Sequence, residues 1–185
     1  MYNYKYAGAG VIIIEIIDSI PYIILGYDRF RKMYTDFGGR FEKNKHDNIK
    51  DVAHMELIEE SCGLFNISQN KLKYYVDTKY YNRIYRTYFI ILKNINIKHY
   101  VKNRNKLKIN KVPKHWLETS KLTKVPIYNI YNCKPKDING NNIKIHNRVL
   151  VPLKKMLYKI HIIPLTQIHK IKNKNLYNTI SYKSI

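Results

Sequence analysis

Three regularly spaced glutamates, Glu56, Glu59 and Glu60, are the residues of this sequence best suited to metal chemistry. Positions i, i+3 and i+4 lie on one side of a helix, so a helical segment here places three carboxylates next to one another. These like charges repel, and the C-terminal end of a helix disfavours anions. A bound cation would offset both costs, which makes the three residues candidate metal ligands.

The helix that carries the glutamates is predicted to run to about Ser61, with Asp47 or Asn48 as its N-cap and Gly63 as its C-terminal signal. With an advance of about 100° per residue, Val52 and Ala53 fall on the same half of the helix as the three glutamates. An acidic cluster on a helix is often only a solvated surface. Here the carboxylates continue the apolar stripe, and inward-facing carboxylates without a partner are costly, which favours a functional site.

The remaining pattern predicts an α/β fold in which helices pack on a mixed β-sheet. A continuous β-branched segment at residues 8–17 indicates a buried strand, and turn residues then lead into a returning strand at residues 22–27. A glycine pair, Gly38 and Gly39, precedes a polar loop and the helix with the glutamates. Beyond that helix we expect three more strands and a second helix, at residues 64–67, 73–76, 86–92 and 147–162.

The charge of the chain is strongly basic but unevenly distributed. The formal net charge is +21, whereas residues 1–60 alone contain more Asp and Glu than Lys and Arg. Such a field attracts polyanions, and RNA is one partner that it would suit. A second explanation stays open, because Ile, Lys, Asn and Tyr make up about half of the chain, which an AT-rich gene produces through its codons.

Residues 98–111 are strongly basic and contain no acidic residue. One interpretation of this segment is a mobile basic loop or an edge hairpin. The other is an arm that contacts phosphate groups and so neutralises a nucleic-acid backbone. In that case the RNA- or phosphate-binding candidates are Lys102, Arg104, Lys106 and Lys108.

Cysteine content and hydropathy indicate an intracellular, cytoplasmic protein. The two cysteines, Cys62 and Cys133, lack metal-ligand spacing and fit a reducing compartment. Charged residues and Pro21 interrupt the apolar N-terminal segment, so no membrane span is expected. We expect one domain over residues 1–163, followed by a basic tail at residues 164–185 whose polar composition is compatible with disorder.

The stretch from Gly39 to Leu64 resembles the Nudix box. In that family the box consists of a Gly, five residues, a Glu, seven residues, and then Arg-Glu-U-x-Glu-Glu-x-Gly-U, where U is a bulky aliphatic residue. Gly39 occupies the place of the first Gly, Asp47 that of the first Glu, and residues 55–64 (MELIEESCGL) that of the remainder. The likeness extends over about residues 8–65 and is loose in the strands that follow.

The resemblance implies an α/β/α sandwich and a hydrolase that requires Mg²⁺ or Mn²⁺. It assigns Glu56, Glu59 and Glu60 as metal ligands, together with the backbone carbonyl of Gly39. Such ligands make chemical sense, because Mg²⁺ prefers oxygen ligands and combines a few protein carboxylates with substrate phosphates. The expected partner is therefore a substrate that contains a nucleotide.

Further roles at the site follow from the same resemblance. Either Glu56 or an acid outside the box would act as general base, and Glu118 is the candidate outside it. Gly38, Arg40 and Asp47 would support the site, Asp47 by holding or capping the helix more readily than by touching metal.

The sequence departs from the family pattern at four points. Two extra residues precede Asp47, Asp replaces Glu there, and one extra residue precedes Gly63. The fourth point is the serious one, because Met55 replaces an arginine that orients a catalytic glutamate in the family. Arg40 or Lys45, from the preceding loop, are candidate substitutes for that arginine.

The function implied is hydrolysis of a nucleoside diphosphate linked to another group. Among such substrates the basic charge favours the RNA 5′ cap, and the chain is similar in style to Nudix decapping enzymes of large DNA viruses. One alternative is a pyrophosphohydrolase of small nucleotides. Another is a Nudix fold that has lost turnover and serves as an RNA-binding or regulatory module, which Met55 motivates.

Overall fold

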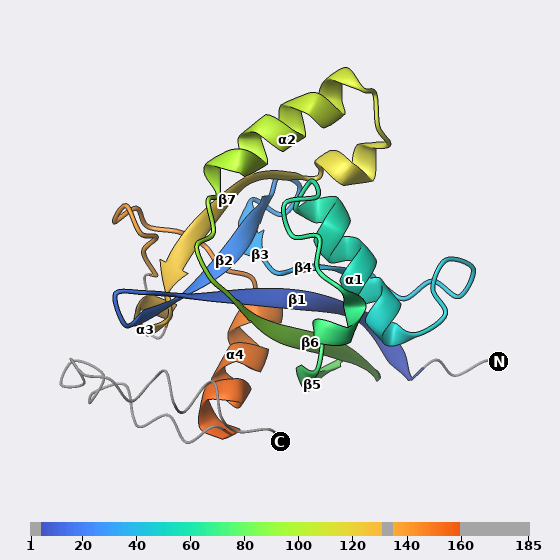
Figure 1. The fold of residues 1–185 in the computed structure, drawn as a ribbon. Helices are drawn as coiled ribbons and strands as arrows, with labels where there is room; N and C mark the ends of the chain where they lie inside the picture. Colours follow the sequence, from blue (N-terminus) through green and yellow to red (C-terminus); the bar gives the residue numbers. More distant parts are fainter. Residues whose placement is uncertain (1–4, 131–134, 160–185) are drawn as a thin grey trace.

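A long central strand, β1 (Tyr6–Ile17), organises the structure. Its apolar side chains alternate between the two faces of the sheet: Val11 and Ile13 belong to one buried cluster, and Ile12 and Ile14 to another. Burial on both faces explains why the segment is continuously apolar. The computed structural model describes residues 5–130 and 135–159, and Figure 1 shows how the elements in these ranges are arranged.

In the described part of the chain, seven strands form one mixed sheet. The strand order is β3-β2-β1-β6-β5, with β4 also paired to β1 and β7 to β2. The β1–β6 pair is parallel and its neighbours are antiparallel. The bounds of the other strands are β2 (Ile20–Asp28), β3 (Met33–Thr35), β4 (Phe37–Arg40), β5 (Tyr74–Tyr80), β6 (Arg83–Leu92) and β7 (Thr119–Pro126).

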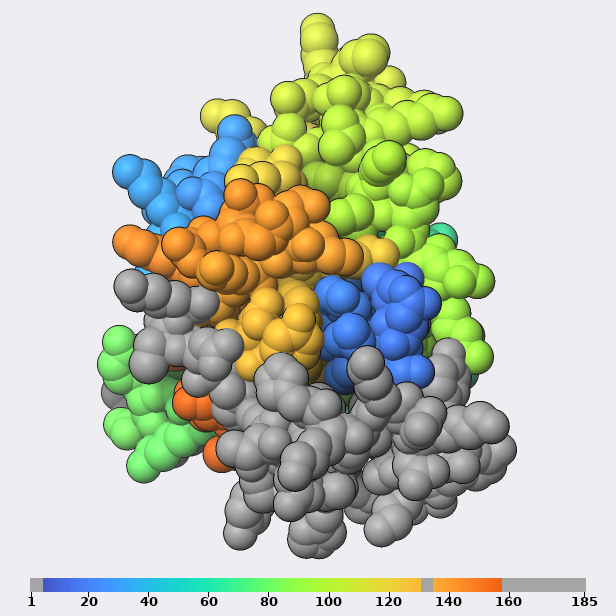
Figure 2. Space-filling view, turned by 90° about the vertical axis from the view of Figure 1, so that its left-hand side faces the viewer, coloured from blue at the N-terminus to red at the C-terminus, as the bar shows by residue number. Residues whose placement is uncertain are grey.

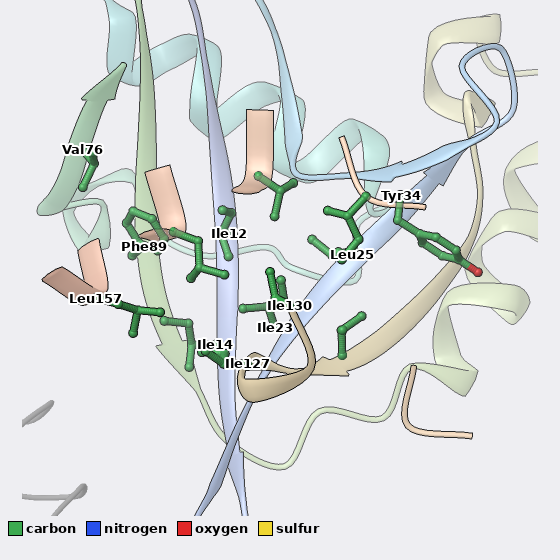
Figure 3. Close-up of a cluster of buried hydrophobic side chains, with 14 residues drawn as sticks. Ile12, Ile14, Ile23, Leu25, Tyr34, Val76, Phe89, Ile127, Ile130 and Leu157 are labelled. Atoms are coloured by element: carbon green, nitrogen blue, oxygen red, sulfur yellow. The ribbon is translucent and has the colours of Figure 1, made fainter. Parts of the chain in front are cut away.

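Helices cover both faces of this sheet, which confirms the predicted α/β fold class. One face packs against α1 (Ile49–Glu60), whose Val52, Ala53 and Leu57 are fully buried. The other face packs against α3 (Ile127–Ile130) and α4 (Asn147–Lys159), as Figures 1 and 3 show. A further helix, α2 (Lys98–Ile109), lies at one end of the molecule, and two short 3-10 helices are η1 (Gln69–Lys71) and η2 (Lys114–Leu117).

Local chemistry fixes both ends of α1, close to the predicted boundaries. The Asn48 side chain accepts hydrogen bonds from the backbone N–H groups of Lys50 and Asp51, while the Asp51 carboxylate accepts from the Asn48 N–H, which completes a capping box. After the helix, Cys62 and Gly63 adopt positive φ angles of 53° and 72°. Glycine tolerates this left-handed geometry without strain, so the chain leaves the helix there.

Two predicted elements differ in the structure. Residues 64–67 were expected as a strand, but they form a turn and loop that is anchored by the buried Phe65, whose ring meets Phe37 at 5.6 Å. Residues 98–111, expected as a loop, hairpin or arm, mainly form α2. The buried positions of α2 are Tyr100 and Arg104, one helical turn apart, and both side chains donate to the carbonyl oxygen of Thr119. This inward face is polar, so apolar periodicity could not reveal it.

Other predicted segments agree with the structure or lie outside the described ranges. The predicted strands at residues 8–17, 22–27, 73–76 and 86–92 correspond to β1, β2, β5 and β6, and the second helix begins at residue 147 as α4. The predicted tail, residues 164–185, and Cys133 fall outside the described residues. None of the helices in the described ranges is long and apolar enough to cross a membrane.

Candidate active site

A cavity of about 520 Å³ lies beside the C-terminal half of α1. Glu56, Glu59 and Glu60 line it together, as their spacing predicts. The remaining lining comes from segments far apart in the sequence: the glycine pair of β4, the loop before α1, the segment around η2, the end of β5, and the start of α4. The tertiary fold therefore surrounds the three glutamates with residues from most of the chain.

The three glutamates are partly withdrawn from water, and this changes their acidity. Burial, followed by the charge of Glu59, raises the pKa of Glu56 from 4.5 to about 7. Burial also raises the pKa of Glu59 and, more strongly, that of Glu60. Glu60 has a compensating contact, because its Oε2 accepts a hydrogen bond of 2.7 Å from the backbone N–H of Gly38. The cluster is therefore electrostatically costly without a cation.

Two glycines allow the backbone of β4 to approach the cluster closely. A Cβ on Gly39 would collide with the carboxylate of Glu56, and a Cβ on Gly8 in β1 would collide with the carbonyl oxygen of Gly39. Both collisions are with oxygen atoms of predicted metal ligands. The missing side chains at Gly8 and Gly39 thus leave the space in which this carbonyl and this carboxylate lie.

The donor set fits a hard divalent cation. Carboxylate and carbonyl oxygens are the ligands that Mg²⁺ and Mn²⁺ accept. In the described ranges, no three Asp, Glu, His or Cys side chains are gathered tightly enough to enclose an ion. Ligation by all three glutamates therefore requires their side chains to rotate toward a common point.

Of the other predicted acidic site residues, Glu118 lines the cavity and Asp47 does not. The charge of Glu118 contributes to the raised pKa values of Glu56 and Glu59. Asp47 is exposed and its backbone N–H donates to Asp51, so Asn48, and not Asp47, caps α1.

Neither loop residue considered as a substitute for the missing arginine forms an ion pair with the three glutamates. Arg40 lines the cavity but is exposed, and Lys45 pairs with Glu42 at 2.7 Å. Met55 also lines the cavity with an uncharged side chain that is 38% exposed. At longer range the charge of Lys45 opposes the rise in the pKa of Glu59, but the positive charge that acts on Glu56 and Glu60 comes from elsewhere in the fold.

Arg148, in the first turn of α4, supplies such a charge, and the sequence analysis missed it. Its side chain lines the cavity, is 14% exposed, and pairs with the fully buried Asp36 at 2.7 Å. Its positive charge opposes the rise in the pKa values of Glu56 and Glu60 that burial causes. A signal existed, since only seven of the 34 basic residues are Arg, and arginine is preferred for buried pairs with planar geometry.

The basic helix α2 divides the predicted phosphate-binding residues into two groups. Lys102, Lys106 and Lys108 are exposed. Arg104 is buried and donates to the carbonyl oxygens of Thr119 and Leu117 at 2.9 and 3.1 Å. The prediction that Arg104 contacts phosphate is corrected, because its guanidinium is used to dock α2 on the segment between η2 and β7.

Comparison with known proteins supports the fold. No protein-family model and no curated protein sequence matches the chain. An Ap4A hydrolase of C. elegans, solved as a binary complex, is similar in structure with a TM-score of 0.50 and 12% identity, over 84% of this chain and 98% of that chain. The NUDIX domain of Shewanella oneidensis NrtR, complexed with ADP ribose, gives a TM-score of 0.45 and 9% identity, over 84% and 90% of the two chains.

At these identities the likeness concerns the fold and not the activity. The arrangement of α1 and α4 on opposite faces of a mixed sheet agrees with that likeness. The chain therefore has the predicted Nudix-like α/β/α sandwich, with the glutamate helix on one face of the sheet and Arg148 reaching the cavity from α4.

Proposed function

We propose that this protein is a divalent-metal-dependent hydrolase of the Nudix type. It cleaves the diphosphate of a nucleoside diphosphate linked to another group, and its preferred substrate is the capped 5′ end of an RNA. One observation carries the proposal: Glu56, Glu59 and Glu60 line a single cavity, partly withdrawn from water. Beside them Gly39 leaves room for the Glu56 carboxylate, and Gly8 leaves room for the Gly39 carbonyl.

The glutamates and the Gly39 carbonyl would hold Mg²⁺ or Mn²⁺. When bound, the ion supplies a Lewis acid that neutralises phosphate charge and lowers the pKa of water. Glu60 is held by the Gly38 N–H, so one of its oxygens has a fixed position. Among the described residues the other two glutamates lack a comparable backbone bond, and Glu59 Oε2 lies 3.6 Å from His115 Nε2.

The proton of the attacking water has two possible acceptors in the cavity. Glu56 has a pKa of about 7, so near neutral pH it exists in both protonation states, which suits a general base. Glu118 is exposed and lines the same cavity, where its charge acts on Glu56 and Glu59. We assign Glu56 as the general base if its carboxylate does not bind the ion. If Glu56 binds the ion, Glu118 accepts the proton of the attacking water.

Cationic side chains on the rim complement a diphosphate. Arg31, Arg40 and Lys45 line the same cavity as the glutamates. Guanidinium and ammonium groups donate charge-assisted hydrogen bonds to phosphate oxygens, and arginine does so in a bidentate manner. The cavity thus combines a metal-binding side for the scissile diphosphate with a basic rim for its remaining charge.

The preference for RNA over a small nucleotide comes from α2. Residues 78–117 contain no acidic residue, and Lys102, Lys106 and Lys108 are exposed within this stretch. α2 packs against η2, which contributes His115 to the cavity lining. A nucleic-acid strand that leaves the cavity along α2 would therefore meet lysines that neutralise its phosphates.

Two alternatives remain as outcomes of the test. A pyrophosphohydrolase of small nucleotides uses the same cavity without α2, and the structural similarity to an Ap4A hydrolase makes dinucleoside polyphosphates suitable probes. An RNA-binding module without turnover is the second alternative, which the uncharged Met55 in the cavity lining favours.

The experiment compares capped RNA, free Ap4A and ADP ribose as substrates, each with Mg²⁺, Mn²⁺ or chelator. We expect metal-dependent release of the cap nucleoside diphosphate from RNA. Glu59→Gln and Glu60→Gln should each lower this rate about 100-fold or more. Asp18→Asn is the matched control, since Asp18 is an exposed acid in the β1–β2 turn, outside the cavity.

Each other outcome identifies a different function. Hydrolysis of free nucleotides without release of the cap product would contradict decapping and support the small-nucleotide enzyme. RNA binding with a steep salt dependence and no hydrolysis would support the binding module. Full activity of the Glu59→Gln, Glu60→Gln double variant would refute the metal site itself.

A further inference from the structure

A buried ion pair joins the C-terminal helix to the strand segment that leads to the glutamates. Asp36, between β3 and β4, is completely buried, and its Oδ1 accepts a hydrogen bond of 2.7 Å from Arg148 Nε. Tyr85 Oη donates to Asp36 Oδ2 at 3.0 Å, and Thr35 Oγ1 donates to Oδ1 at 2.9 Å. Both oxygens of the carboxylate thus have partners, as a buried charge requires.

Backbone hydrogen bonds to β3 fix the chain segment just before Arg148. The N–H of Tyr34 donates to the carbonyl of Lys144 at 2.8 Å, and the N–H of His146 donates to the carbonyl of Tyr34 at 2.9 Å. Val149, the next residue, is fully buried in the core. Figure 2 shows the segment that leads into α4 (orange) beside the segment that follows β2 (blue). Arg148 is therefore a fixed point against which Asp36 is positioned.

The start of β4 connects Asp36 to the glutamates. Gly38 lies two residues after Asp36, and its N–H donates to Glu60 Oε2 at 2.7 Å. A Cβ on Gly38 would collide with Tyr85 Oη, and a Cβ on Gly10 would collide with Asp36 Oδ2. The network therefore fills the space between β1 and β4 closely. A displacement of Asp36 moves the N–H group that holds Glu60.

We propose that Arg148 is a positioning residue: by pairing with Asp36 it fixes the backbone of β4 and, through Gly38, the carboxylate of Glu60 for cation binding. The inference deepens the proposed function and rests on it for the identity of the cation site. Met55 has no positive charge, and Arg148 of α4, on the other face of the sheet, supplies one.

The test measures the affinity for Mn²⁺ by calorimetry, separately from turnover. Arg148→Met should weaken Mn²⁺ binding about tenfold or more and lower kcat by a similar factor, with KM for the nucleotide nearly unchanged. Arg148→Lys keeps the charge but loses the planar fork, so its Mn²⁺ affinity should lie between those of the wild type and Arg148→Met.

Arg86→Met is the matched control. Arg86 pairs with Asp77 at 2.8 Å, its side chain is 15% exposed, close to the 14% of Arg148, and it does not line the cavity. Its removal also breaks the ion pair of a largely buried arginine, so both variants should lose thermal stability. Arg148→Met should lose more, because it leaves the fully buried Asp36 without its cation, whereas Asp77 is 33% exposed. The Mn²⁺ affinity of Arg86→Met should stay equal to that of the wild type.

The sign of the change in Mn²⁺ affinity distinguishes a positioning role of Arg148 from a purely electrostatic effect. Removal of a positive charge near a cation site tightens cation binding if charge alone acts, so equal or tighter Mn²⁺ binding by Arg148→Met would overturn the proposal. A raised KM with unchanged Mn²⁺ affinity would also overturn it and indicate a contact with substrate. If Arg148→Met does not fold, wild-type affinity in Arg148→Lys rejects the proposal and weakened affinity supports it. Weakened Mn²⁺ binding together with no hydrolysis by the wild type would refute the proposed function but keep the positioning role.

Discussion

Replacement of Glu56 by glutamine should stabilise the metal-free protein at neutral and alkaline pH. Burial and the neighbouring Glu59 raise the pKa of Glu56 to about 7, so the folded state holds this carboxylate in an environment that disfavours its charge. Glutamine has nearly the same size and no charge. The substitution therefore removes the electrostatic cost while it leaves the packing almost unchanged.

The magnitude follows from the shift itself. A rise from 4.5 in the unfolded chain to about 7 in the folded state corresponds to about 3 kcal/mol in the free energy of unfolding. Because the folded-state pKa is the higher one, the folded state binds the proton more tightly. Stability is full below pH 4.5 and is lost as the pH rises from about 4.5 to about 7. Above that range the loss is constant.

Urea unfolding in the presence of chelator, from pH 4 to pH 8, measures this effect. Glu56→Gln should be about 3 kcal/mol more stable than the wild type at pH 8 and equally stable at pH 4. Glu59 and Glu60 add to the pH dependence of both proteins. The difference between the two curves contains the titration of Glu56 together with the relief of Glu60, whose pKa the charge of Glu56 helps to raise. Added Mn²⁺ should stabilise the wild type more than the variant, because a ligand is lost.

Glu42→Gln is the control for a glutamate outside the buried cluster. Glu42 is exposed, and its pairing with Lys45 lowers its pKa, so its replacement should give no gain in stability at pH 8. A Glu56→Gln variant that is less stable than the wild type at pH 8, or a difference between the two proteins that does not change with pH, would refute the argument that Glu56 is held at an electrostatic cost.

Two further predictions concern residues around the glutamates. Met55→Arg should change kcat less than about threefold, because Arg148 already provides the orienting charge; a large increase in single-turnover rate would show that orientation is still deficient. Gly38→Ala should destabilise the fold by about 3 kcal/mol in urea unfolding, since its Cβ would meet the backbone of β1 as well as Tyr85. Gly39→Ala should mainly weaken Mn²⁺ binding, since the three atoms nearest to its Cβ all belong to the side chain of Glu56. Equal stability losses in the two variants would contradict this distinction.

The sequence by itself determined the features that depend on local spacing. The i, i+3, i+4 positions of the glutamates, the capping box at Asn48 and the glycine after α1 are properties of a single helix and its ends. The continuous burial of β1, whose side chains alternate between two covered faces of the sheet, likewise follows from its unbroken apolar sequence and the period of a strand. These elements were predicted with nearly correct boundaries because each contains its own structural signal.

The same reasoning failed where the signal lies in a distant partner. α2 has Tyr100 and Arg104 on its inner face, and the carbonyl oxygens of Thr119 and Leu117 explain why such polar groups are buried. Likewise, the turn and loop at residues 64–67 exist because Phe65 enters the core beside Phe37. In both cases the periodicity of the segment gave no information about what would cover it.

Tertiary structure alone decided the electrostatics of the site. Arg148 and Asp36 are 112 residues apart, and no spacing rule connects them. The fold brings the start of α4 to the edge of β3, which places the Arg148 guanidinium at the cavity of the three glutamates. Position 55, beside these glutamates, has an uncharged methionine. Burial, which raises the pKa values of the glutamates, is likewise a property of the assembled sheet and helices. The sequence determined which residues could bind a metal; their environment was determined by packing, because charges in a protein depend on everything that surrounds them.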